Sequence, residues 1–193
     1  MKAFFDRYSY NIIKMYVYQF AISMFGSVLA MATAAAGNKT LTLIVSIFSI
    51  LFYLYLLYTL VWEVGATDRI AVDTGKRAYR AHTGLVMALV ANIPNFIIAI
   101  VYTIPYSSMA TVEWAGNMAA IARVSSIITE GMYLGVVTAV KVAGQSLQHY
   151  WWTYFLMALP AVITAWAGYV LGHKNFRMFA GLVQKKPDSS TKK

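Results

Sequence analysis

The residues best placed to do chemistry lie in an otherwise apolar stretch, residues 118–142. This stretch carries Arg123, Glu130 and Lys141, and its polar residues recur in steps of three and four. Such spacing predicts one polar stripe along a helix, opposite a face of Ala, Ile, Val and Leu. Charge facing hydrocarbon is costly, so the stripe is expected to face protein, water or lipid headgroups. The stripe consists of Arg123, Ser126, Glu130, Tyr133, Val137 or Thr138, Lys141 and Gln145.

The polar stripe has two interpretations. In the first, the helix lies at the membrane surface, or an Arg123–Glu130 pair mainly orients helices. In the second, the stripe lines a polar path or pocket inside a helix bundle, where Glu130 binds a ligand or carries a proton. The sequence favours the first interpretation and leaves the second open.

A second polar group, Asn92-Ile93-Pro94-Asn95, interrupts the apolar segment 84–104. Pro94 cannot donate a backbone hydrogen bond and displaces the carbonyl one turn earlier. The amides of Asn92 and Asn95 could satisfy this kink locally, as is common in membrane helices. Alternatively, the break exposes carbonyls and amides to a ligand or ion, as in transporters. The candidate ligand-binding residues are therefore Asn92, Asn95, Arg123 and Glu130.

Enzymatic chemistry has little to build on in this sequence. Cysteine is absent, which excludes a thiolate nucleophile, a thiolate metal site and a disulfide. His82, His149 and His173 lack the spacing of a metal site, and no set of nucleophile, base and oxyanion donors is visible. We therefore expect no enzymatic activity, no metal and no cofactor.

Long apolar segments make up most of the remaining chain and must position these polar residues. Of the 193 residues, 60% are hydrophobic and 12% are charged, whereas a soluble domain carries about a quarter charged residues. The charges cluster between stretches long enough to cross a bilayer, for which roughly 17–25 residues suffice. We predict an all-α integral membrane protein with spans at residues 15–36, 40–62, 84–104 and 150–172.

Basic residues predict the orientation of the chain. The net charge is +9, and the Lys and Arg residues flank apolar segments, which indicates anionic lipid headgroups rather than nucleic acid as the partner. The positive-inside rule places the N-terminus, the polar loop 63–83 and the basic tail 173–193 in the cytoplasm, for a protein of the cell membrane. Within the loop, Lys76, Arg77 and Arg80 are candidate contacts for lipid headgroups or a partner.

A cytoplasmic N-terminus and a cytoplasmic tail require an even number of crossings, yet five apolar segments are present. Placing Glu130 at the centre of a span costs about 2.5–3.5 kcal/mol on insertion scales. The prediction is therefore a domain of four full spans, residues 1–172, in which residues 118–142 form an amphipathic re-entrant or interfacial helix. Five full spans, with an external tail, are the alternative.

Two functional hypotheses remain. The leading one is a small non-enzymatic multi-pass subunit that packs against a membrane partner, or a second copy of itself, and presents a basic cytoplasmic face. It is motivated by faces of small residues in the first and last spans, which let helices approach closely. The alternative is a transporter or substrate-binding membrane component, with a polar site formed by the Asn-Ile-Pro-Asn kink and the Arg123/Glu130 stripe. The small residues are Gly26, Ala30, Ala34, Ala161, Ala165, Gly168 and Gly172.

Overall fold

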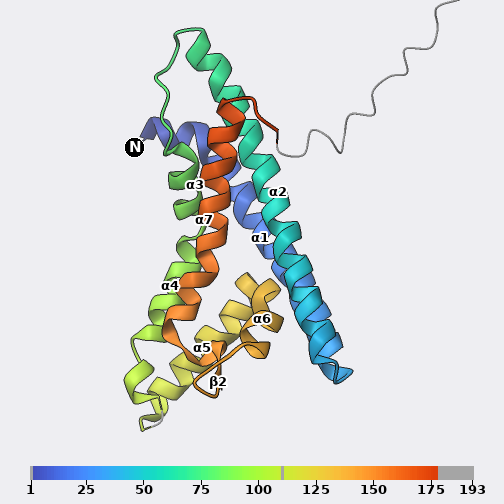
Figure 1. The fold of residues 1–193 in the computed structure, drawn as a ribbon. Coiled ribbons are helices and arrows are strands. Elements are labelled where there is room, and N and C mark those ends of the chain that lie inside the picture. Colours follow the sequence, from blue (N-terminus) through green and yellow to red (C-terminus); the bar gives the residue numbers. More distant parts are fainter. Residues whose placement is uncertain (1, 110, 178–193) are drawn as a thin grey trace, which may run out of the picture.

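The fold is a bundle of helices with one short β-hairpin (Figure 1), as seen in a computed structural model that describes residues 2–109 and 111–177. The two strands of the hairpin are antiparallel, with Lys141 opposite Ser146. Along the chain, the elements are α1 (Lys2–Ala35), α2 (Lys39–Asp73), α3 (Thr83–Ala91), α4 (Ile93–Thr103), η1 (Tyr106–Ser108), α5 (Glu113–Glu130), η2 (Gly131–Tyr133), α6 (Leu134–Ala139), β1 (Lys141–Val142), β2 (Gln145–Ser146), η3 (Leu147–His149) and α7 (Trp151–His173).

Four helical segments are long and apolar enough to cross a membrane: α1, α2, α7 and the run Glu113–Ala139 that joins α5 to α6. The pair α3 and α4, bent by 54° at Asn92, would form a fifth span if counted as one. Many large apolar side chains on these helices are exposed, among them Val28, Leu51 and Ile163. Exposed apolar surface on this scale suits lipid. The all-α, membrane-compatible class predicted from the sequence is confirmed.

Two helices extend further than the hydropathy pattern predicted. Helix α1 begins at Lys2 rather than near Met15, and α2 runs on to Asp73. The expected polar loop 63–83 is therefore largely helical, and only residues 74–82 connect α2 to α3. Hydropathy finds the apolar part of a helix, whereas the helix itself continues through polar residues until Gly75, whose φ of +70° ends it. Most of the predicted tail, residues 178–193, lies outside the described residues.

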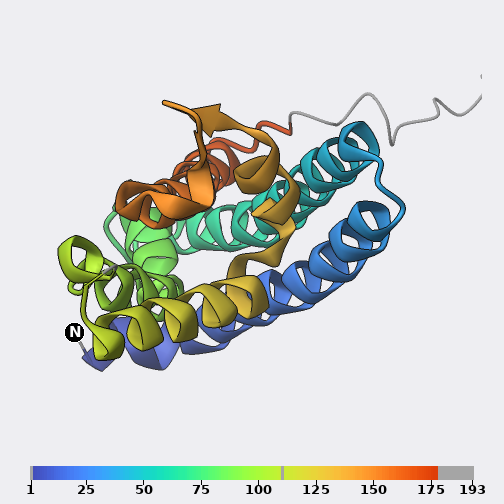
Figure 2. The same cartoon turned by 90° about the horizontal axis from the view of Figure 1, so that it is seen from below.

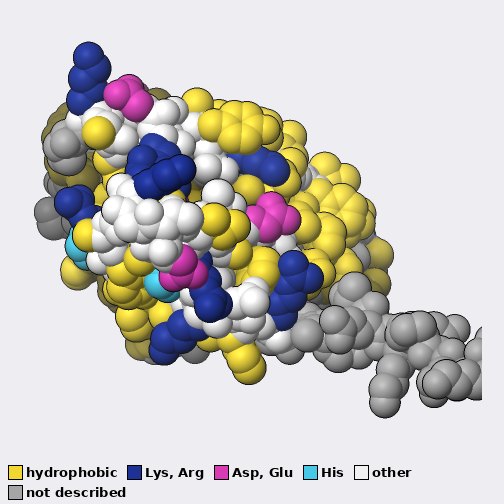
Figure 3. Space-filling view, turned by 90° about the horizontal axis from the view of Figure 1, so that it is seen from above, with side chains coloured by type: hydrophobic (Ala, Val, Ile, Leu, Met, Phe, Trp, Pro, Cys, Tyr) yellow, Lys and Arg dark blue, Asp and Glu magenta, His cyan; other side chains and the backbone are white. Residues whose placement is uncertain are grey.

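The two ends of the bundle differ in charge. The N-terminus, residues 74–82 and the end of α7 lie together at one end, here called the basic end (Figures 1 and 3). Residues 36–38, 104–109, 111–112 and 140–150 lie at the opposite end, here called the loop end. The loop end carries Lys39 and Lys141. The basic residues that belong to the basic end are Lys2, Arg7, Lys14, Arg69, Lys76, Arg77, Arg80, Lys174 and Arg177.

A buried carboxylate joins three helices at the basic end. Asp68 of α2 is only 4% exposed, and it accepts hydrogen bonds from the Arg7 guanidinium, from the Tyr8 hydroxyl at 2.5 Å and from the Tyr169 hydroxyl at 2.9 Å. A buried charge is tolerated only when it is paired and hydrogen-bonded. Asp68 therefore fixes the positions of α1 and α7 against α2.

The small-residue faces are used inside the chain. A Cβ at Gly172 would lie 2.1 Å from the carbonyl oxygen of Trp62, so α7 and α2 touch backbone to backbone. A Cβ at Gly84 would lie 2.6 Å from the carbonyl oxygen of Ala165, which brings α3 equally close to α7. Gly26 packs against Met132 in the same way. The face of α7 that was expected to meet another protein is therefore occupied by α2 and α3.

Replacing Asp68 with Asn should lower the free energy of unfolding by roughly 2–3 kcal/mol, because a hydrogen-bonded buried charge is lost and Arg7 is left without its counter-ion. The measurement is reversible unfolding of the purified protein in mixed micelles. Asp73→Asn is the matched control, since Asp73 forms only an exposed pair with Arg69 on the same helix. Equal stability of the two variants would show that Asp68 does not hold the helices together.

Candidate functional site

The candidate site is built around a break between α5 and α6, within the helical run Glu113–Ala139. Helix α5 stops at Glu130, the 3-10 turn η2 follows, and α6 begins at Leu134. The chain changes direction at this turn, so α6 does not continue the line of α5 (Figure 2). A helix break leaves backbone N–H groups without their usual carbonyl partners, and in an apolar setting each of them must find another acceptor.

Serine hydroxyls from the two neighbouring helices supply these acceptors. The N–H of Gly131 donates to Ser23 Oγ of α1, and the N–H of Gly135 donates to Ser46 Oγ of α2 at 2.8 Å. Both serines are completely buried. The hydrogen bond of Gly131 therefore holds the break to α1, and that of Gly135 holds the start of α6 to α2.

Glycine is required at both anchored positions because the backbones approach so closely. A Cβ at Gly131 would lie 2.7 Å from Ser27 Cβ, and a Cβ at Gly135 would lie 2.4 Å from the carbonyl oxygen of Thr42. Both distances are shorter than real Cβ contacts, so a larger residue would push the break away from α1 or α2. The position of the break is therefore set by packing as well as by hydrogen bonding.

Glu130 lies at the break, near the middle of the bundle. The carbonyl oxygen of the adjacent Thr129 accepts a hydrogen bond from Gln19 Nε2 at 3.3 Å. Gln19 stands about 25 Å from either end of α1 at the usual 1.5 Å rise per residue. Glu130 is only 3% exposed, so the sequence has placed an ionisable group deep among apolar helices.

The carboxylate of Glu130 is incompletely satisfied. Within the described part of the chain its Oε1 atom has no hydrogen-bond partner, and neither has the hydroxyl of Tyr133. The Tyr53 hydroxyl of α2 donates to Gln19 Oε1 of α1 at 3.5 Å. Polar groups of α1, α2 and η2 therefore lie near the helix break, but in the described residues none of them bonds to Glu130 Oε1.

Arg123, two turns earlier on α5, has different neighbours. It donates to the hydroxyl of Tyr102 at 3.0 Å and also interacts with Tyr154. Both tyrosines reach the backbone of η3, because the Tyr154 hydroxyl donates to the Gln148 carbonyl at 3.1 Å and the Tyr102 hydroxyl to the His149 carbonyl at 3.3 Å. Arg123 Nε is buried and has no partner among the described residues.

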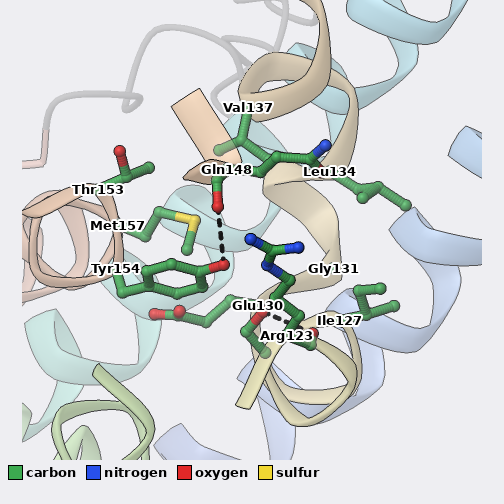
Figure 4. A pocket seen from close by; sticks show the side chains of 11 residues that line it. Arg123, Ile127, Glu130, Gly131, Leu134, Val137, Gln148, Thr153, Tyr154 and Met157 are labelled. Atoms are coloured by element: carbon green, nitrogen blue, oxygen red, sulfur yellow. Dashed lines mark hydrogen bonds between the residues drawn. The ribbon is translucent and has the colours of Figure 1, made fainter. Parts of the chain in front are cut away.

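A cavity of about 120 Å³ joins the two charged residues (Figure 4). Its walls come from α5, η2, α6, η3 and the first turns of α7. The guanidinium of Arg123 lies beside the hydroxyl end of Tyr154, whereas the Glu130 side chain extends below the Tyr154 ring. No ion pair joins Arg123 to Glu130 in the described residues, and the orienting pair considered from the sequence does not form.

The structure does not bring Asn92 and Asn95 to this cavity. Both are 1% exposed. Asn92 Nδ2 donates to the Ala88 carbonyl and Asn95 Nδ2 to Asn92 Oδ1, each at 2.9 Å. The two amides are thus engaged at the Pro94 kink itself, although Asn95 Oδ1 is left without a partner in the part of the chain that the structure describes.

The other predicted residues are divided between the cavity and the surface. Ser126 and Val137 line the cavity with the two charged residues. Lys141 and Gln145 leave the helical stripe, because the chain turns into the β-hairpin and exposes them. The predicted headgroup contacts Lys76, Arg77 and Arg80 are exposed at the basic end.

Gln19, Ser23, Ser46 and Tyr53 contribute to the site but were not predicted from the sequence. Their spacing is helical, since Gln19 and Ser23 are one turn apart on α1 and Ser46, Ser49 and Tyr53 recur in steps of three and four on α2. These stripes are uncharged, and single hydroxyls in apolar helices usually bond to their own backbone. Ser49 does so.

No group of three or more His, Asp or Glu side chains that could hold a metal ion occurs in residues 2–109 and 111–177. Comparisons with known protein families, curated proteins and solved structures find no match.

Replacing Ser46 with Ala should destabilise the protein by about 1–3 kcal/mol, because the buried N–H of Gly135 loses its acceptor. Unfolding in mixed micelles measures the change. Ser49→Ala is the matched control, since Ser49 is equally buried on the same helix but bonds only to the Val45 carbonyl. If Ser46→Ala were no more destabilising than Ser49→Ala, the helix break would not depend on the α2 hydroxyl.

Proposed function

We propose that the protein is a non-enzymatic membrane component that binds or transports a small polar solute, with Glu130 and Arg123 as its binding groups. The observation that carries this proposal is the buried Glu130 carboxylate, which borders a cavity and lacks a full set of partners. Ionisable residues in membrane helices are expensive and usually face a functional path. A cavity with a few convergent polar groups is the expected form of a ligand site.

The proposed membrane arrangement has four crossings and one re-entrant segment. The crossings are α1, α2, the bent pair α3–α4, and α7. The rings of Tyr102 in α4 and Tyr154 in α7 are 4.4 Å apart, so the segment 104–150 between these helices starts and finishes at the loop end. Helices α5 and α6 would then enter the membrane from the loop end and return to it, with Glu130 near the apex.

The basic end is proposed to face the cytoplasm of a cell-membrane protein. The concentration of Lys and Arg at this end supports that orientation under the positive-inside rule. Lys76, Arg77 and Arg80 are then placed to contact anionic headgroups, each contributing about 1 kcal/mol. Solute would reach Glu130 from the loop end, on the opposite side of the membrane.

Packing inside the chain weakens the alternative of a partner-binding subunit. That hypothesis, with a membrane partner or a second copy as its target, was motivated by small-residue faces on the first and last spans. Gly172 and Gly84 make their close contacts within this chain, and Gly26 packs on Met132. The basic end is the surface that still supports a partner, and it would suit lipid headgroups equally well.

The Glu130→Gln variant tests the proposed function. Purified full-length protein is screened by thermal unfolding with small amines, carboxylates and amino acids. At least one class should stabilise the natural protein, by about 2.7 kcal/mol at a hundredfold excess over its Kd. At the same concentration, this class should stabilise the Glu130→Gln variant by no more than about 1.4 kcal/mol, because the carboxylate is missing and binding is at least about tenfold weaker.

The exposed Glu113 at the start of α5 provides the matched control, and Glu113→Gln should respond as the natural protein does. The proposal is wrong if every solute class has the same effect on the natural protein and on Glu130→Gln.

A further inference from the structure

The cavity beside α5 is bordered by an acidic and a basic side chain, Glu130 and Arg123, which do not form an ion pair in the described residues. Within the same part of the chain each side chain retains one buried polar atom without a hydrogen-bond partner, Oε1 of Glu130 and Nε of Arg123. An ion pair between them would be the simplest way to lower the cost of burial. The two side chains instead point to different parts of the cavity (Figure 4).

Contacts with neighbouring residues keep the Arg123 and Glu130 side chains apart. The Arg123 guanidinium is retained by its hydrogen bond to the Tyr102 hydroxyl, which is itself held by the η3 backbone. Glu130 is fixed at the end of α5 by the break that Ser23 anchors. Between them, Tyr154 and Met157 present a largely apolar wall. The site is therefore preorganised as an acidic group and a basic group separated by apolar surface.

We propose that the ligand is a small zwitterion, which carries an ammonium group and a carboxylate within the same few atoms. This inference rests on the proposed function and narrows it to one class of solute. The ammonium of the ligand would bind the Glu130 carboxylate, and the ligand's carboxylate would accept hydrogen bonds from the Arg123 guanidinium. The short apolar part of the ligand would lie against Tyr154 and Met157.

A ligand with a single charge satisfies only half of this site. A cation at Glu130 leaves Arg123 Nε buried and unpaired, and an anion at Arg123 leaves the carboxylate unpaired. A site built with paired polar groups rejects an analogue that lacks one of them, because the unmatched group stays desolvated. The arrangement thus favours zwitterions over simple amines and simple carboxylates.

The cavity volume limits the size of the ligand. A protein cavity of about 150 Å³ accommodates benzene, which has six heavy atoms. The 120 Å³ found here suits a molecule of similar or slightly smaller size. Glycine, L-alanine and β-alanine are zwitterions in this range, whereas amino acids with large side chains exceed it.

Equilibrium dialysis of the purified full-length protein with radiolabelled glycine, L-alanine and β-alanine tests the proposal. At least one of the three should bind, and Glu130→Gln and Arg123→Gln should each weaken binding by about tenfold or more. Ethylammonium and propionate, which each keep one charge, should compete at least about tenfold less well than the zwitterion. Lys141→Gln removes an exposed charge outside the cavity and should leave binding unchanged.

A variant that retains the positive charge separates loss of binding from loss of folding. Arg123→Lys should bind the zwitterion more tightly than Arg123→Gln, because Lys keeps the positive charge that Gln removes. The zwitterion proposal is overturned if none of the three ligands binds, if ethylammonium binds as tightly as they do, or if Arg123→Gln binds normally. Binding of ethylammonium that depends on Glu130 alone would overturn it and still uphold the proposed function. A lack of response to every solute class would overturn both.

Discussion

The structure depends on how the backbone is satisfied where the helical run breaks at Gly131–Tyr133. Exposed N–H groups at this depth have no water to bond with if the bundle lies in a membrane, and the cost of leaving them unpaired is several kcal/mol each. Ser23 and Ser46 remove that cost by accepting from Gly131 and Gly135. The same contacts hold the end of α5 beside α1, and they thereby fix where Glu130 lies. The position and burial of the acid therefore depend on these two hydroxyl groups and on the close packing of Gly131 and Gly135.

The basic end provides the rigid frame against which this break is held. Asp68 draws α1 and α7 onto α2, and the close approach of Gly172 to Trp62 keeps α7 in register with α2. The helices diverge toward the loop end, where the α5–α6 segment fills the space between them (Figure 1). The tightly packed basic end and the more open loop end suit the re-entrant site that we propose, because such a site needs fixed walls and an entrance.

Much of the architecture could be predicted from the sequence, since apolar length and helical periodicity are local properties. The long apolar helices, the break at Pro94 and the part of the polar stripe from Arg123 to Val137 are all of this kind. The predicted continuation of the stripe to Lys141 and Gln145 is wrong, because the chain turns into the β-hairpin. The site could be predicted only in part. Arg123 and Glu130 do share a cavity, but Asn92 and Asn95 bond within their own kink. The anchoring role of Ser46 depends on a residue 89 positions away, and no local pattern distinguishes it from Ser49.

In the proposed arrangement the α5–α6 segment enters and leaves the membrane at the loop end, so residue 130 should be reachable from that side. Because the chain has no cysteine, single cysteines at Ser107, Glu130, Gln145 and Ala78 can be probed in intact cells with a membrane-impermeant methanethiosulfonate. Reaction at positions 107, 130 and 145 without permeabilisation, and at position 78 only after it, is the predicted result. If position 145 reacted from the same side as position 78, the segment would be a full span and the re-entrant arrangement would be wrong.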